Sequence, residues 1–307
     1  MNSKMQFSGT ALRKGLAATL LAFVATQAMA DPRAQTPDVA VFPQYDTAHV
    51  YVAAGGADAF IRSFVATFGG QASKGIEANS ASAMNDGESQ YVWSPVGTLA
   101  VFNSSTPRQV PLGYMVLDMD KAIAEAKAVG AKVIDGPSQE STGRSAVVEW
   151  PGGVTMQLYS DSARPNYAPL ASVPEHRVYV PRADADAFVQ DFVRFSRGQV
   201  ASDNRQRDAT EIGRIGETYR RIRITSEFGI LLVLATDGKL PAPFGQESSG
   251  YGVEDLATTI EKARAAGATV VSPSFDAGDR SGVMVQFPGG YVAEIHSDKF
   301  WVKWDGR

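Results

Sequence analysis

Apolar and polar positions alternate in two short segments of the chain, and a segment with helical spacing follows each of them. The alternation in residues 49–52 and 176–180 predicts two short strands. Behind each strand, phenylalanines recur on one face of a predicted helix: Phe60, Phe64, Phe68, Phe188, Phe192 and Phe195. Glycines after both runs, at 69–70 and 198, predict the ends of these helices.

The same order of patterns continues after each predicted helix. A hairpin-like segment comes next, "QYVWSPVGTLAVFN" in one place and "TYRRIRITSEFGILLVLA" in the other. A strand then leads into an alanine-rich amphipathic helix that ends at Gly130 or at Gly267. A further strand, a Pro-Gly-Gly turn and a last strand follow, because glycine readily supplies the positive φ of a tight turn. The pattern predicts an α+β fold with mostly antiparallel sheets.

The chain aligns with itself over most of its length. "WPGGVTMQLYSD" from Trp150 matches "FPGGYVAEIHSD" from Phe287, 137 positions later. Residues 113–133 match residues 250–270 at the same spacing. Two long copies indicate a duplicated domain rather than a solenoid, which would need more and shorter repeats.

The repeat also extends upstream of these segments. The segment that begins at His49 matches the segment that begins at His176, at a spacing of 127 or 128. We therefore predict one module over residues 46–163 and a second over residues 172–300. A Pro- and Ala-rich linker at residues 162–174 is predicted to join them.

The N-terminus has the pattern of a targeting segment. Three basic residues come first, an apolar run follows at residues 15–25, and Ala-Met-Ala stands at residues 28–30. This order predicts a secretory signal peptide over residues 1–30, cut before Asp31, and a periplasmic or secreted protein. A membrane anchor is less favoured, because the apolar run is shorter than the roughly 20 residues that span a bilayer.

Composition narrows the classes of function. Of 307 residues, 44% are hydrophobic and 20% are charged, as in ordinary soluble proteins. The formal net charge is −4, and loss of the basic N-terminal segment makes the chain more acidic. This argues against nucleic acid as a partner, and we expect no membrane association after cleavage. The chain has no cysteine, so a metal ion would need His, Asp, Glu or Gln ligands.

Taken in order, these motifs resemble the vicinal oxygen chelate superfamily, which includes glyoxalases, bleomycin-resistance proteins and extradiol dioxygenases. The resemblance rests on a first-strand histidine, a helix that ends in glycine, "D-x-x-x-A-x-A-x-x-x-G-A-x-V", and "P-G-G-x-x-x-E-[IL]" on the last strand. It covers nearly the whole mature chain. It implies two tandem βαβββ modules whose curled, mostly antiparallel sheets surround a shared cavity.

The resemblance also implies metal ligands on the first and last strands of each module. Carried onto this sequence, the positions are His49 and Gln157 in the first module and His176 and Glu294 in the second. Gln157 departs from the commoner glutamate, and a neutral amide is a weak ligand that cannot act as a base. Glu294 is therefore the expected catalytic carboxylate. His296 lies two residues further along the same strand face and is an additional candidate.

Three functions are open for such a site. The first is an exported glyoxalase-like lyase or isomerase, in which a divalent metal (Zn, Ni, Mn or Fe) polarises adjacent oxygens of a small substrate and a carboxylate moves a proton. The second is an extradiol-type ring-cleaving dioxygenase with Fe(II). The third is metal-free binding or sequestration of a small molecule, as in bleomycin-resistance proteins. The oligomeric state stays open.

A run of arginines in the second module is a further candidate for binding. It comprises Arg205, Arg207, Arg214, Arg220, Arg221 and Arg223. Such a run indicates either a surface that receives an anionic substrate or a solvated face, and the second is the commoner case.

Overall fold

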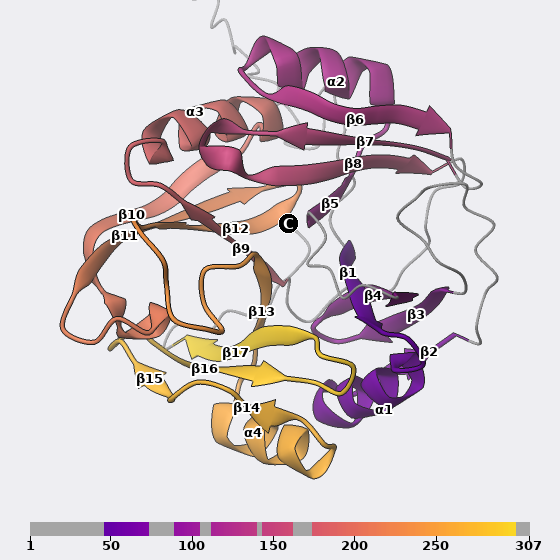
Figure 1. Cartoon of the computed structure of the whole chain (residues 1–307), viewed down its shortest axis with the longest axis vertical. Coiled ribbons are helices and arrows are strands. Elements are labelled where there is room, and N and C mark those ends of the chain that lie inside the picture. The colour runs from indigo at the N-terminus through magenta and orange to yellow at the C-terminus, as the bar shows by residue number, and fades with distance from the viewer. Residues whose placement is uncertain (1–45, 74–88, 105–111, 140–142, 162–173, 299–307) are drawn as a thin grey trace, which may run out of the picture. The chain divides into compact units, whose positions relative to one another are not determined.

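The computed structural model describes residues 46–73, 89–104, 112–139, 143–161 and 174–298 (Figure 1). All of them belong to one compact unit, Pro37–Arg307. The predicted signal peptide and residues 162–173 of the predicted linker lie outside these ranges. We call residues 46–161 the first copy and residues 174–298 the second copy.

The two copies have the same order of elements. The first contains β1 (Asp46–Ala53), α1 (Ala57–Phe68), β2 (Gln71–Ala72), β3 (Ser89–Ser94), β4 (Gly97–Ser104), β5 (Leu112–Met115), α2 (Met119–Ala128), β6 (Lys132–Gln139), β7 (Gly143–Glu149), η2 (Pro151–Gly153) and β8 (Thr155–Asp161). The second contains β9 (Glu175–Val180), α3 (Ala185–Ser196), β10 (Gln199–Asp208), η3 (Ala209–Ile212), β11 (Thr218–Ser226), β12 (Gly229–Ala235), β13 (Ser248–Gly252), α4 (Leu256–Ala265), β14 (Thr269–Val270), β15 (Phe275–Asp276), β16 (Arg280–Gln286) and β17 (Val292–Asp298). The predicted α+β class is confirmed. Each copy contains the βαβββ order twice, with β14 and β15 as short strands in the last unit.

The second helix of each copy begins at an aspartate that caps it. The Asp118 carboxylate accepts a hydrogen bond from the Lys121 N–H at 3.0 Å, and that of Asp255 accepts one from the Thr258 N–H at 2.9 Å. Each bond satisfies a backbone donor that the first turn of a helix leaves without a partner. In the part of the chain that the structure describes, no helix is long and apolar enough to cross a membrane.

The strands are joined differently in the two copies. Those of the first copy form two sheets, β1-β4-β3-β2 and β5-β8-β7-β6. Those of the second form one continuous sheet, β10-β11-β12-β9-β13-β17-β16-β14, with β15 paired to β16. The continuous sheet arises because β9 pairs with β13. Most neighbouring strands are antiparallel, as predicted.

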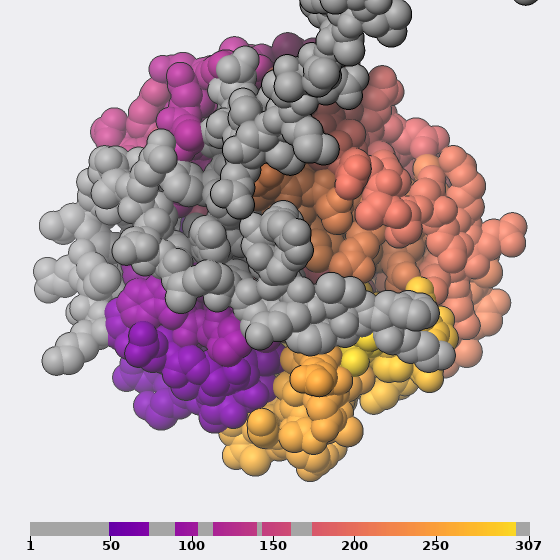
Figure 2. All heavy atoms as spheres, turned by 180° about the vertical axis from the view of Figure 1, so that it is seen from behind, coloured from indigo at the N-terminus to yellow at the C-terminus, as the bar shows by residue number. Residues whose placement is uncertain are grey.

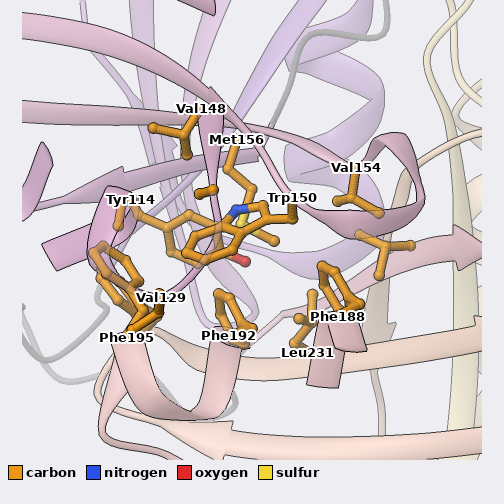
Figure 3. Close-up of a cluster of buried hydrophobic side chains, with 14 of the residues drawn as sticks. Tyr114, Val129, Val148, Trp150, Val154, Met156, Phe188, Phe192, Phe195 and Leu231 are labelled. Atoms are coloured by element: carbon orange, nitrogen blue, oxygen red, sulfur yellow. The ribbon is translucent and has the colours of Figure 1, made fainter. Parts of the chain in front are cut away.

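Each copy buries its aromatic helix in an apolar cluster that the other copy shares. In one cluster, Trp150 of the first copy contacts Phe192 and Phe195 of α3, with ring centroids 5.8 and 5.2 Å apart (Figure 3). In the other, Phe64 of α1 contacts Phe287 of the second copy at 5.6 Å. Figure 2 shows the indigo residues of α1 beside the orange residues of α4. Because both clusters are built from both copies, we expect neither copy to bury its apolar surface alone.

The two Pro-Gly-Gly turns make close contacts between the copies. Gly152 and Gly289 are equivalent turn positions, with φ of +82° and +86°. A methyl group on Gly152 would lie 2.7 Å from Val180, and one on Gly289 would lie 2.7 Å from Val52. The Ala53 N–H donates to the Gly289 carbonyl oxygen at 3.0 Å. Glycine therefore serves both the backbone conformation and the close approach, which explains why the sequence repeats this turn.

Candidate functional site

Side chains alternate across a strand, so each sheet has one face toward the helices and an opposite face, which we call the inner face. On β1, Val50 and Val52 lie in the apolar cluster with α1. His49 therefore lies on the inner face of the first copy. Its ring there contacts Phe102 of β4 and Tyr159 of β8, with ring centroids 5.6 and 5.7 Å away.

On β9 the same alternation turns the predicted ligand away from the inner face. Val178 and Val180 lie in the apolar cluster with α3, so His176 shares the helix-facing side and Arg177 lies on the inner face. The His176 ring centroid is 5.5 Å from that of Tyr114, and the residue is 1% exposed. Burial lowers the pKa of His176 to about 4, so the imidazole is neutral at ordinary pH.

Strand pairing shows which first-strand residues are equivalent. His49 lies opposite Ala100, and Arg177 lies opposite Leu232. Ala100 and Leu232 are each the fourth residue of their strand. The register therefore matches His49 with Arg177, and not with His176 as predicted. A shift of one residue moves a side chain to the other face of the sheet.

The last strands are in the predicted register. Gly113 of β5 pairs with Gln157 of β8, and Gly250 of β13 pairs with Glu294 of β17, in the same parallel arrangement. Gln157 and Glu294 are thus equivalent, and each faces the inner side of its own copy.

In the second copy, Glu294 is fully buried and pairs with two arginines. Arg177 Nη1 donates to Glu294 Oε2, and Arg280 Nε lies 3.2 Å from Glu294 Oε1. Arg280 Nη1 also lies 2.8 Å from a carboxylate oxygen of Glu175. Burial by itself would raise the pKa of Glu294, but Arg177 and Arg280 hold it well below the usual range. Burial by itself would also raise the pKa of Glu175, but Arg280 lowers it to about 2.

Two further charged side chains and a histidine complete this inner face. Arg223 lies 3.3 Å from Glu175 and 3.7 Å from Asp298. His296 Nδ1 lies 3.4 Å from Glu294. We call the following residues the charged cluster: Glu175, Arg177, Arg223, Arg280, Glu294, His296 and Asp298. Its three carboxylates are matched by three guanidinium groups, so the cluster is balanced without an added ion.

The arginine-rich run is mostly paired. Arg221 lies 2.9 Å and Arg207 3.4 Å from the buried carboxylate of Glu211. On the opposite face of β11, Arg220 lies 2.7 Å from Asp203. These arginines stabilise their own sheet, and they present neither the open anion-binding surface nor the simple solvated face that the sequence suggested.

In the first copy the equivalent positions are neutral. The His49 imidazole is hydrogen-bonded to Gln157, and burial lowers the pKa of His49 to about 4, although this bond acts in the opposite direction. His49 Nδ1 is buried and has no hydrogen-bond partner, so the contact with Gln157 involves the other ring nitrogen, Nε2.

The four predicted ligands do not converge on one point. They divide among three places: His49 with Gln157 on the first inner face, His176 in an apolar cluster, and Glu294 in the charged cluster. The predicted centre, which needs both first-strand histidines beside Glu294, therefore does not fit a metal ion.

A different trio comes closer to the geometry of a metal site. Ligand atoms of Glu175, His296 and Asp298 lie within 4.8 Å of one another. However, Arg280 Nη1 is 2.8 Å from the first of these carboxylates and 3.5 Å from the last. A divalent cation among them would meet that guanidinium charge at close range, so this trio also fits a metal ion poorly.

A cavity of about 370 Å³ lies at the ends of β9 and β12 in the second copy. Its lining includes Tyr179, Thr236, Leu240 and Phe244. The loop that carries the last two also covers part of the inner face through the apolar cluster of this copy. The cavity is large enough for a small ligand.

Sequence reasoning did not identify Glu175, Arg177 or Arg280. A signal for Arg177 was present, because Val-Tyr-Val at 50–52 and at 178–180 align at a spacing of 128. That spacing matches His49 with Arg177. Arg280 has no comparable signal, since it reaches Glu294 only through the pairing of β16 with β17.

Among known proteins, those similar to this chain were found by comparing structures. No protein-family model and no curated protein sequence matches the chain. It is similar to the Mn(II)-bound glyoxalase from Novosphingobium aromaticivorans at 14% identity and a TM-score of 0.51, over 84% of this chain and 83% of that one. It is similar to homoprotocatechuate 2,3-dioxygenase from Arthrobacter globiformis at 14% identity and a TM-score of 0.53, over 86% and 83% of the two chains.

A variant of homoprotocatechuate 2,3-dioxygenase from Brevibacterium fuscum is also similar, at 13% identity and a TM-score of 0.54. The match covers 88% of this chain and 74% of that one. At such identities the likeness concerns the fold. Together with the element order and the motifs, it establishes that this chain has the fold of the vicinal oxygen chelate superfamily.

Proposed function

We propose that this protein is an exported small-molecule-binding protein that uses the vicinal oxygen chelate fold without a bound metal ion. The observation that carries the proposal is the pairing of Arg177 with Glu294. The two residues stand on the first and last strands of the second copy, where the family resemblance places metal ligands. A guanidinium cannot coordinate a metal ion, and it neutralises the carboxylate that could.

The protonation states on the inner faces support binding rather than proton transfer. A general base works best when its pKa lies near the operating pH. The pKa of Glu294 is held well below the usual range by Arg177 and Arg280, after burial has acted in the opposite direction. Burial lowers the pKa of His49 to about 4, and Gln157 has no basic group. The groups that the resemblance offered as bases are therefore weak ones.

A second candidate function is a metal-dependent enzyme, a glyoxalase-like lyase or a dioxygenase. Two observations favour it: the convergence of Glu175, His296 and Asp298, and the lack of a well-aligned hydrogen bond to either oxygen of Glu175, despite the proximity of Arg280. The names of the structural relatives, a Mn(II)-bound glyoxalase and a 2,3-dioxygenase, point the same way. In this case the three side chains would hold a divalent metal of the Mn or Fe kind, and Arg280 would have to move.

Metal analysis of the full chain separates the two candidates. We expect protein purified without chelator to contain far less than stoichiometric transition metal. Small ligands found in a thermal-shift screen should stabilise it equally before and after EDTA treatment. Stoichiometric metal that His296→Gln removes, with ligand binding lost at the same time, would overturn the proposal in favour of the enzyme. His176→Gln is the matched control, because its side chain faces away from the charged cluster.

Export is proposed from the N-terminal pattern. Residues 1–30 have the order of a signal peptide, and the mature chain should begin at Asp31. Mass spectrometry of the protein made in its native host tests this. An intact N-terminus on the accumulated protein would contradict export with cleavage.

A further inference from the structure

We propose that the cavity at the ends of β9 and β12 is the ligand site, and that it takes a small organic anion with an apolar body and a single charge. The inference rests on the proposed small-molecule-binding function and specifies its place and its ligand class. The cavity has a volume of about 370 Å³, at the small end of the range for ligand pockets. Its described lining contains none of the predicted metal ligands.

The wall of this cavity is a loop that is longer than its counterpart in the first copy. Residues 236–247 join β12 to β13 (Figure 1), whereas residues 105–111 join the equivalent strands β4 and β5. The longer loop supplies most of the lining, including Thr236, Lys239, Leu240 and Phe244. Because the first copy completes the same order of elements with the shorter connection, the fold does not require the extra residues, and they are available for binding.

Contacts from outside the cavity hold the loop in place. Arg214 Nη2 donates to the carbonyl oxygens of Asp237 and Lys239, at 2.9 and 3.2 Å. Gly213 has a φ of +78°, and a methyl group on it would lie 2.7 Å from the Phe244 ring. The loop is therefore fixed on both sides of the cavity wall, and the cavity is preformed, as ligand sites usually are.

The inside of the cavity offers apolar surface for the body of a ligand. Tyr179, Leu240 and Phe244 line it and belong to one apolar cluster. Tyr179 follows Arg177 by two residues on β9, so its side chain lies on the inner face of the second copy. Val180 adds to the apolar part of the lining. An apolar group that enters this space leaves water, which favours binding.

One buried donor of the lining has no acceptor. The Tyr179 hydroxyl is buried and has no hydrogen-bond partner. Burial raises the pKa of Tyr179, while Arg177 and the Gly245 N–H act in the opposite direction, so the hydroxyl is protonated at neutral pH. The Gly245 N–H is itself a donor and leaves the hydroxyl hydrogen unused. Other buried groups also lack a partner, such as the Tyr114 hydroxyl, but among them only Tyr179 belongs to the described lining of this cavity.

The charges at the cavity select an anion. The described lining contains one base, Lys239, and one acid, Asp237, and both are exposed. Asp237 is already paired, because Arg182 Nε lies 3.4 Å from its Oδ2 and the Arg182 N–H donates to its Oδ1 at 3.1 Å. Among the described residues, no carboxylate pairs with Lys239. An anionic head group is therefore the acceptor that both the Tyr179 hydroxyl and the Lys239 ammonium lack, and one ammonium matches one negative charge.

Three related probes test the ligand class on the full chain by isothermal titration calorimetry near neutral pH. The probe 2-naphthoate is an anion, 2-naphthamide is a neutral molecule of nearly the same shape, and 2-naphthylmethylammonium is a cation. We expect 2-naphthoate to bind about threefold more tightly than 2-naphthamide, as one exposed ion pair predicts. We expect the cation to bind least tightly. Salt at about 1 M should remove the preference for the anion, because it screens an exposed charge.

Matched substitutions assign the preference to named groups. Lys239→Gln should lower the affinity for 2-naphthoate to that for 2-naphthamide. Lys262→Gln makes the same change of charge on α4, outside the described lining, and should leave the preference intact. Tyr179→Phe removes only the buried hydroxyl and should weaken both probes about fivefold, since a carboxylate and an amide each carry an acceptor oxygen.

A single thiol locates the site, because the chain has no cysteine of its own. Gln246→Cys places the thiol on an exposed part of the lining. Saturating 2-naphthoate should slow its reaction with N-ethylmaleimide at least about fivefold, since a pocket encloses most of the surface of its ligand. Gln199→Cys places the thiol at the exposed start of β10, outside the described lining, and its reaction rate should not change.

Each other outcome overturns a defined part. Binding of 2-naphthoate without protection of Gln246→Cys places the ligand elsewhere and ends this inference, while small-molecule binding stands. Equal binding of the three probes contradicts the choice of an anion, and an unchanged affinity in Tyr179→Phe contradicts the role of the hydroxyl. If no probe binds, the ligand class is wrong, and the thermal-shift screen with and without EDTA judges the binding function separately. Protection that EDTA removes and Mn²⁺ restores keeps the cavity and overturns the metal-independent function.

Discussion

The inner faces of the two copies differ in charge at equivalent positions. In the first copy a neutral imidazole, His49, is hydrogen-bonded to a neutral amide, Gln157. In the second copy a guanidinium, Arg177, is paired with a carboxylate, Glu294. The change from His49 to Arg177 goes together with the change from Gln157 to Glu294, because a buried carboxylate needs a cation beside it and a buried amide does not. Glu294 is thus explained by its pairing with Arg177, without a metal ion.

The comparison also separates what the two copies share from what differs between them. The turn glycines, the helix caps and the strand register are shared, and the turn glycines contact the other copy. The side chains that face inward are free to differ, provided that each face stays balanced. The second copy uses its inner face for ion pairs, and the first holds a neutral imidazole beside a neutral amide.

The largest effect should come from removing one charge of the second copy. Glu294→Gln leaves the buried Arg177 without its carboxylate and should cost about 3–5 kcal/mol in the free energy of unfolding. Gln157→Leu in the first copy leaves a neutral imidazole unpaired and should cost about 1–2 kcal/mol. Urea denaturation measures both.

The double variant Arg177→His with Glu294→Gln sharpens this comparison. It places the neutral pair of the first copy into the second, and should be less destabilised than Glu294→Gln alone. If the loss of unfolding free energy in the double variant equals the sum of the losses in Arg177→His and Glu294→Gln, the two residues do not stabilise the protein as a pair.

The turn glycines should behave alike in both copies. Gly152→Ala and Gly289→Ala each force a side chain into a positive φ and to within 2.7 Å of a valine of the other copy. Each should cost about 2–4 kcal/mol in the free energy of unfolding, from backbone strain and overpacking together. Thermal denaturation of the two variants checks this. A large loss in only one of them would break the symmetry of the contact between copies.

Much of the fold could be predicted from the sequence, because its signals are local. Phenylalanines at helical spacing and glycines at the turns identify helices and turns without knowledge of the partner. The match of Gln157 with Glu294 was also predicted correctly, since the Pro-Gly-Gly motif fixes the register of the last strand.

The centre of the site could not be predicted in the same way. The prediction aligned the two first strands by matching His49 with His176, which is one residue away from the observed register. A shift of one residue places every side chain of a strand on the opposite face of the sheet. The apolar positions Val50 and Val178, which must both face a helix, give the correct register. The contact of Arg177 with Glu294 joins residues 117 positions apart, and only the pairing of β9, β13 and β17 brings them together.

Stability should depend on pH through the two buried histidines. Burial lowers the pKa of His49 and of His176 to about 4, against an unfolded value of 6.5. Between these values the unfolded chain binds more protons at both histidines, which makes the free energy of unfolding rise with pH. Glu247 opposes that rise, because burial raises its pKa from 4.5 to about 7. His176→Phe removes one of the two histidines and should lower the slope between pH 4.5 and 6.5. An unchanged slope in chemical denaturation would contradict the burial of His176 as a neutral ring.

The carboxylates of the charged cluster act in a separate, more acidic window. Burial would raise the pKa of Glu175, but Arg280 lowers it to about 2, below the unfolded value of 4.5. Its stabilising contribution is therefore complete above pH 4.5 and is lost as the pH falls toward 2. His176→Phe should leave this part of the curve unchanged, which makes it an internal control.

The smallest expected effect compares the paired glycines of the inner faces. At Gly250 an added methyl would lie 3.2 Å from His296, and at Gly113 it would lie 3.2 Å from Tyr159. The initial crowding is thus equal, and neither glycine has a positive φ that would add strain. His296 is 3% exposed and is held beside Glu294, whereas Tyr159 is only partly buried and has more room to move. Gly250→Ala should therefore cost about 1–3 kcal/mol and Gly113→Ala less than about 1 kcal/mol, measured by urea denaturation. Equal losses would mean that the first inner face is packed as firmly as the second.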